Sequence, residues 1–122
     1  MSSLPNPLEK LAQDFLKAWQ DAHGVKSGRV CALSGSNHLA IIIEDSFSQA
    51  ERKLAEGQSG ETLLKQYAIE LLNQISDQMS DRIERATGRD VLSSDLIVNP
   101  DSDQVVFTFR LSRAASKPAT SP

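Results

Sequence analysis

The clearest pattern in the chain is a helical repeat of apolar residues between Ser59 and Gly88. Apolar side chains recur there at spacings of three and four residues, which places them on one face of an α-helix. Ser59 is suited to cap the first turn, and Gly88 to take the left-handed conformation that ends many helices. The pattern predicts a helix about 40 Å long, which should extend past any seven-residue strand of about 23 Å. Its apolar residues are Leu63, Leu64, Tyr67, Ala68, Leu71, Leu72, Ile75, Met79 and Ile83.

Two shorter helices are predicted before this one. Asn6 followed by Pro7 is typical of a helix start, because proline at the first helical position loses no hydrogen bond. The first helix then carries Leu8, Leu11, Ala12, Phe15, Trp19 and Ala22 on one face and is expected to end near His23 and Gly24. Ser48 and Glu51 have the spacing of a capping box, which predicts a second, short helix running to about Glu56.

Four apolar segments predict strands in two hairpins. The first hairpin joins 29–33 to 39–43 through the turn residues 34–37, in which Gly35 and Asn37 tolerate a positive φ. Its return strand is apolar at every position, so both faces of this strand should be covered. The second hairpin joins 91–98 to 104–111 through 99–103. In its last strand Val105, Phe107, Phe109 and Leu111 alternate with Val106, Thr108 and Arg110.

The predicted order is α-β-β-α-α-β-β, an α+β fold in which helices cover a four-stranded antiparallel sheet made of the two hairpins. Residues 6–111 are expected to form one domain, with a flexible N-terminus at 1–5 and a disordered tail at 112–122. If the helices cover one face of the sheet, the other face still carries apolar residues, and exposed contiguous apolar surface usually marks an interface. We therefore predict a homodimer or a docked protein partner. The predicted contact residues are Ala40, Ile42, Val106, Thr108, Met79 and Ile83. The first helix crossing to that face is an equally open alternative.

Composition narrows the classes of function. The net charge is -3, which argues against nucleic-acid binding because phosphate contacts need concentrated Lys and Arg. A single cysteine, Cys31, forms no internal disulfide, and no apolar run approaches the roughly 20 residues of a membrane span. We therefore expect a cytoplasmic protein without direct membrane insertion.

Candidate catalytic chemistry is sparse. His23 and His38 lack a second ligand at metal spacing, and His23 is expected to satisfy carbonyls at the end of the first helix. Asp101 and Asp103 are interpreted as turn residues, because the glycine and glutamate of a calcium loop are missing. Cys31 is expected to be a buried strand residue, and a nucleophile only if a histidine lies beside it. No catalytic, cofactor or metal motif is found, so we predict no enzyme activity and no cofactor.

Several segments, in this order and spacing, resemble the MpsC-like family. Residues 47–54 are similar to its LT-x-x-E-x-x-L stretch, and they are followed by Gly60-Glu61-Thr62-Leu63, by Ile83-Glu84-x-x-Thr87-Gly88-Arg89-Asp90-Val91 with Asp95, and by Val105-Val106-Phe107-Thr108-Phe109. The resemblance covers about Leu8 to Leu111. It implies an accessory role beside membrane proteins that take up inorganic carbon and support the membrane potential, and it carries over no catalytic residue.

The expected function is therefore that of a non-enzymatic accessory or adaptor protein that binds a protein partner and is peripheral to a membrane only through that partner. Two alternatives stay open. One is an assembly chaperone that captures an extended tail of its client by strand addition. The other is a small cytosolic enzyme or ligand sensor that uses Cys31, His38 and an acidic residue.

Overall fold

The computed structural model describes residues 7–113, which form three α-helices, four strands and a short 3₁₀ helix. The predicted flexible start, 1–5, and the tail from residue 114 lie outside these residues. Ser112, the first residue of the predicted tail, donates its backbone N–H to the Asp90 carbonyl at 2.9 Å. The elements are α1 (Pro7–His23), β1 (Arg29–Gly35), β2 (His38–Glu44), α2 (Gln49–Leu54), α3 (Gln58–Thr87), β3 (Val91–Asn99), η1 (Pro100–Ser102) and β4 (Gln104–Leu111).

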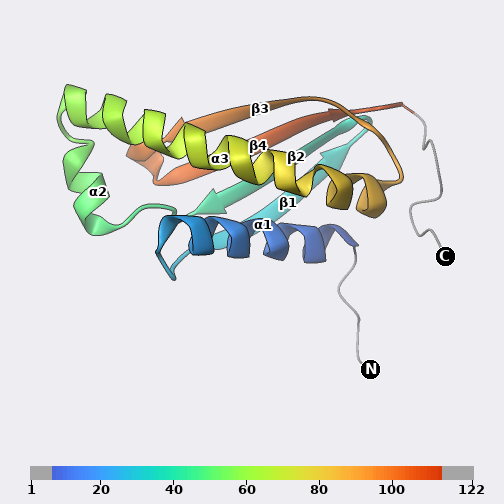
Figure 1. Cartoon of the computed structure of the whole chain (residues 1–122), viewed down its shortest axis with the longest axis horizontal. Helices are drawn as coiled ribbons and strands as arrows, with labels where there is room; N and C mark the ends of the chain where they lie inside the picture. The colour runs from blue at the N-terminus through green and yellow to red at the C-terminus, as the bar shows by residue number, and fades with distance from the viewer. Residues whose placement is uncertain (1–6, 114–122) are drawn as a thin grey trace.

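The strands form one antiparallel sheet in the order β1-β2-β4-β3 (Figure 1). Both hairpins are present, and β4, which ends the chain order, lies inside the sheet beside β2. The α+β class, the element order and the four-stranded antiparallel sheet are therefore confirmed.

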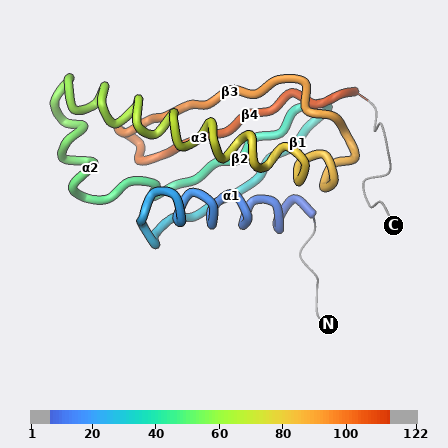
Figure 2. The backbone as a smooth tube through the Cα atoms, viewed as in Figure 1, coloured from blue at the N-terminus to red at the C-terminus, as the bar shows by residue number. Residues whose placement is uncertain are grey.

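Both long helices cover the same face of the sheet, where α1 and α3 run side by side (Figures 1 and 2). Phe15 of α1 packs edge-on against Phe107 of β4, with ring centroids 4.7 Å apart. The inward residues of β2 and β4, such as Ile41 and Val105, are fully buried beneath the helices. The alternative in which the first helix crosses to the other face is wrong, because α1 and α3 contribute to one shared core.

The buried stripe of α3 is narrower than predicted. Leu64, Ala68, Leu72, Ile75, Met79 and Ile83 are buried, whereas Leu63 and Tyr67 are 59% and 45% exposed. The first turns of α3 extend past the sheet beside α2 (Figure 1). Because the sheet does not reach this part of the helix, only its innermost residues find a core.

Local signals at the element ends were partly right. The capping box is confirmed, since Ser48 accepts from the Glu51 N–H at 3.2 Å and Glu51 accepts from the Ser48 N–H at 2.8 Å. Gly88 ends α3 with φ 71° as predicted, but α3 is preceded by Gly57 rather than capped by Ser59. In the first hairpin the positive φ falls on Ser36, at 51°, and Gly35 continues β1.

Gly60 makes the sharp corner between α2 and α3 possible. It is buried, and a Cβ at this position would collide with the backbone carbonyl of Leu54, whose carbon would lie 2.9 Å away. Replacing a glycine in a helix interior with alanine normally stabilises the helix by about 1 kcal/mol. Here the backbones of the two helices would have to separate instead.

We therefore expect Gly60→Ala to lower the free energy of unfolding by roughly 1–3 kcal/mol, the range of an overpacked site. Chemical denaturation followed by circular dichroism measures this change. Gly35→Ala is the matched control, because a Cβ at that position would have no neighbour within 4 Å and its φ is not positive, and we expect a change within about 0.5 kcal/mol. Equal stability of Gly60→Ala and the parent chain would contradict the close approach.

Candidate functional site

The face of the sheet opposite the helices is uncovered in the described chain, and we call it the open face. Strand register defines its side chains, because residues paired across antiparallel strands point to the same face. One row runs Cys31, Ile42, Val106 and Ile97, and the next runs Leu33, Ala40, Thr108 and Asp95. We call the seven of these residues other than Asp95 the apolar band.

The edges of the apolar band are the most accessible. Leu33 on β1 is 59% exposed and Ile97 on β3 is 51% exposed, which is high for large aliphatic side chains. The four predicted contact residues on the two central strands, Ala40, Ile42, Val106 and Thr108, all lie in this band and are half-buried. Contiguous apolar surface of this kind is typical of an interaction site.

The other two predicted contact residues lie elsewhere. Met79 and Ile83 are 4% and 0% exposed in the core beneath α3, so they offer no surface to a partner in the folded chain. Conversely, the prediction missed Cys31, Leu33 and Ile97. Apolar and polar residues do not alternate regularly in β1 and β3. The face on which these three side chains lie therefore follows only from the register of β1 with β2 and of β3 with β4.

Arg110 and Glu44, which differ in the sign of their charge, lie at opposite ends of the open face. His38 and Arg110 are opposite one another at one end. Glu44 lies at the other end, where the neighbouring Arg29 pairs with Asp45 at 3.1 Å. Among residues 7–113, His38, Arg110 and Glu44 make no ion pair. The open face also carries Asp95, in the row next to Arg110, and Arg29, opposite Glu44, so neither end of the face carries a single sign of charge.

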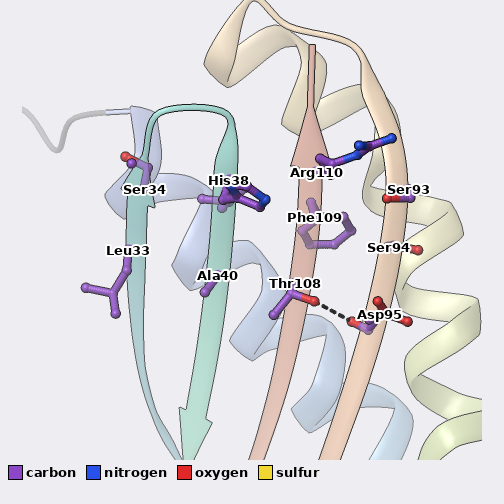
Figure 3. Close-up of a pocket in the computed structure, with 12 residues that line it drawn as sticks. Leu33, Ser34, His38, Ala40, Ser93, Ser94, Asp95, Thr108, Phe109 and Arg110 are labelled. Atoms are coloured by element: carbon purple, nitrogen blue, oxygen red, sulfur yellow. Dashed lines mark hydrogen bonds between the residues drawn. The ribbon is translucent and has the colours of Figure 1, made fainter. Parts of the chain in front are cut away.

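A shallow hollow of about 450 Å³ lies on the half of this face that carries Arg110 and Asp95. Figure 3 shows it from the strand side, with Leu33, Ala40 and Thr108 in one row across three strands. His38 and Arg110 lie on neighbouring strands above this row, and the Arg110 side chain points toward β3. Thr108 donates its hydroxyl to the backbone carbonyl of Asp95 at 3.4 Å. The hollow offers apolar contact and hydrogen-bonding groups together, which suits a protein segment or side chain of mixed character.

The structure does not bring together the pair needed for thiolate chemistry. Cys31 is exposed rather than buried as expected, and it pairs with Ile42, four residues along β2 from His38. The Cα atoms of Ile42 and His38 are therefore about 13 Å apart along β2, and Cys31, on the neighbouring strand, is at least as far from His38. Proton transfer between a thiol and an imidazole needs hydrogen-bond contact, so this arrangement lacks the proposed Cys–His pair.

His23 has a different role from the predicted helix capping. Its side chain is 1% exposed, stacks on Trp19 at 4.3 Å, and its Nε2 lies 2.8 Å from Glu51 Oε1. Within the described residues its buried Nδ1 has no hydrogen-bond partner. The pair connects α1 to the capping box of α2, and sequence reasoning missed it because 28 residues separate the two.

Residues 7–113 contain neither a metal-binding cluster of side chains nor a membrane-spanning helix. No three His, Cys, Asp or Glu side chains in this range are grouped as an ion would require. None of the helices between Pro7 and Thr87 is both long enough and apolar enough to cross a membrane.

Comparison with known proteins then identifies the family. The family model described as "Na+-translocating membrane potential-generating system (MpsC)" matches residues 8–113. The chain belongs to the MpsC family. The match spans α1 to the end of β4, so the MpsC-family region includes the whole sheet and its open face. No curated protein and no solved structure matches the chain significantly.

Membership in the MpsC family confirms the resemblance derived from the sequence segments. It associates the chain with a Na⁺-translocating, membrane-potential-generating system, as the family description states. In this MpsC-family chain, the open face with its apolar band lies within the region that the family model matches.

Proposed function

We propose that this chain is a non-enzymatic accessory protein of a Na⁺-translocating membrane system and that it acts by binding a protein of that system through the open face. The observation that carries the proposal is the apolar band, with Leu33 and Ile97 more than half exposed at its edges. A sheet with one covered face buries the other against a second layer when its residues are apolar.

The family supplies the class of partner. Its description names a membrane-potential-generating system, while no helix between residues 7 and 113 could itself cross a membrane. Contact with a membrane subunit would connect these two facts. A cytoplasmic site beside the membrane, and a link to inorganic-carbon uptake, belong to the same proposal.

The test is capture of the partner from native membranes. The tagged chain is incubated with detergent-solubilised membranes of its source cells, and bound proteins are identified by mass spectrometry. We expect a subunit of the Na⁺-translocating system. Ile97→Glu should reduce its recovery at least about tenfold, because a charge would be buried in an apolar interface without a partner.

Leu63→Glu is the matched control, since Leu63 is 59% exposed on α3 and lies away from the sheet. We expect it to capture the subunit as well as the parent chain does. Loss of capture with Leu63→Glu and retention with Ile97→Glu would move the binding surface to the start of α3 and overturn the proposal. Recovery of no subunit of the system would overturn it as well.

Strand addition is a second candidate, favoured by one observation. β1 is an edge strand that pairs with β2 without interruption over all seven residues, whereas β3, at the other edge, has an irregularity between Val91 and Ser93. Irregular edges discourage pairing and regular ones permit it. If a client segment adds to β1, its amide protons in the complex should gain protection from hydrogen exchange, together with those of β1.

A further inference from the structure

The open face is complementary to itself. Consider a second copy laid on it with the two-fold axis in the plane of the interface and perpendicular to the strands. This operation places each strand antiparallel over its own counterpart, so the two ends of the face exchange places. The row of Ile42 and Val106 then lies over the second copy's row of Ala40 and Thr108.

Side-chain size favours this arrangement. Ile42 would face the much smaller Ala40, and Val106 the similarly sized Thr108, so the bulkiest of the four residues meets the smallest across the interface, as in well-packed layers. A two-fold axis parallel to the strands would instead stack each row on itself, with β2 over β4 of the second copy. Ile42 would then face Val106, so that two large side chains meet, and Ala40 would face Thr108, which leaves unfilled space beside them.

Charge selects the same arrangement. With the axis across the strands, His38 lies over the second copy's Glu44, and Arg110 lies one strand away from that carboxylate. Each such contact occurs twice because the interface is isologous. With the axis parallel to the strands, Arg110 would lie one strand away from Arg110 of the second copy, and Glu44 one strand away from Glu44 of the second copy. Like charges so close at an interface disfavour that arrangement.

We propose that the open face of the isolated protein closes on a second copy in this antiparallel arrangement. The proposal rests on the proposed function in that both assign the open face to protein binding. A membrane-system subunit and the second copy are then alternative occupants of one surface.

The size of the face sets the strength of the dimer. Four strands about 4.8 Å apart and seven residues long give a footprint of roughly 20 by 23 Å, or about 450 Å². Stable complexes bury about 800 Å² on each partner, and weaker ones bury less. An interface of this size is expected to be weak and reversible, which permits exchange for another partner.

The test is a charge-swap cycle measured by analytical ultracentrifugation. We expect a reversible dimer of the parent chain. Glu44→Lys and Arg110→Glu should each raise the dissociation constant at least tenfold, and the double variant should return to within about threefold of the parent. Asp77→Lys is the control for net charge, because it makes the same change of charge at an exposed position on α3. We expect it to leave the dissociation constant unchanged.

Cys31 supplies an independent readout because it is exposed in the single chain and lies within the proposed interface. Its reaction rate with a thiol reagent should fall as the protein concentration rises through the dissociation constant. A chain that stays monomeric at all concentrations, or a double variant weaker than both single ones, would overturn the antiparallel dimer.

The two proposals fail in different ways. A monomeric chain whose capture of the membrane subunit still depends on Ile97 would end the dimer proposal and leave the proposed function standing. A dimer with the predicted charge-swap behaviour, together with unchanged capture by Ile97→Glu, would end the proposed function and leave the dimer proposal standing.

Discussion

Ile41→Lys is expected to unfold the domain, whereas Ile42→Lys is expected to leave it folded. The two residues are neighbours on β2 and point to opposite faces. Ile41 is 0% exposed beneath the helices, and Ile42 is half-buried on the open face. A lysine among apolar side chains either loses its proton or stays charged without a partner, and both outcomes are costly.

We expect Ile41→Lys to cost at least about 4 kcal/mol, out of a total stability that is typically 5–15 kcal/mol. Ile42→Lys should cost less than about 1 kcal/mol, because its ammonium group can reach solvent along the open face. Denaturant titration measures both, with the single Trp19 as a fluorescence probe.

The same pair separates folding from association. Ile42→Lys should remain folded but lose both self-association and capture of the membrane subunit. A severe loss of stability in Ile42→Lys would show that its position belongs to the core, and the open face would then no longer be available as an interface.

Trp19→Ala is expected to have the second large effect. Trp19 is 0% exposed, and its Nε1–H donates to the backbone carbonyl of Ser46 at 3.1 Å. It also stacks on His23 and meets the ring of Phe47 edge-on, with centroids 6.0 Å apart. This one side chain thus connects α1 to the segment that leads from β2 into α2.

Truncation of a buried tryptophan costs about 3–5 kcal/mol, and the Ser46 carbonyl would lose its donor as well. Trp19→Phe separates these two contributions, since it retains an aromatic ring but removes the N–H donor. We expect Trp19→Phe to cost about 1–3 kcal/mol. Circular dichroism during denaturation is the appropriate measurement, because these variants lack the fluorescent residue.

A cost for Trp19→Ala below about 1 kcal/mol would contradict the central position of this side chain. Equal costs for the phenylalanine and alanine variants would mean that the hydrogen bond to Ser46, rather than ring packing, accounts for the stabilisation.

Periodicity predicted those parts of the fold in which one face is buried throughout. β4 was predicted with its observed bounds because Val105, Phe107, Phe109 and Leu111 alternate without exception. The capping box at Ser48 and the C-terminal Gly88 were predicted because each is a local device. The buried arc of α3 was predicted too wide, because Leu63 and Tyr67 continue its apolar pattern past the end of the sheet.

The candidate site was harder to predict because it depends on pairing between distant strands. Ile42 and Val106 were predicted as contacts, but Ile97 joins them only through the register of β3 with β4, and Cys31 only through that of β1 with β2. The His23–Glu51 pair depends on the fold placing the start of α2 beside the end of α1, and it has no signal in local sequence.

The central claim is that the open face is the surface that binds a protein of the Na⁺-translocating system. Site-specific photo-crosslinking in native membranes tests it most directly, with benzoylphenylalanine replacing Ile97 in one variant and Asn73, exposed on α3, in another. We expect a crosslink to a subunit of the system from position 97 and none from position 73. A crosslink to that subunit from position 73 alone would contradict it.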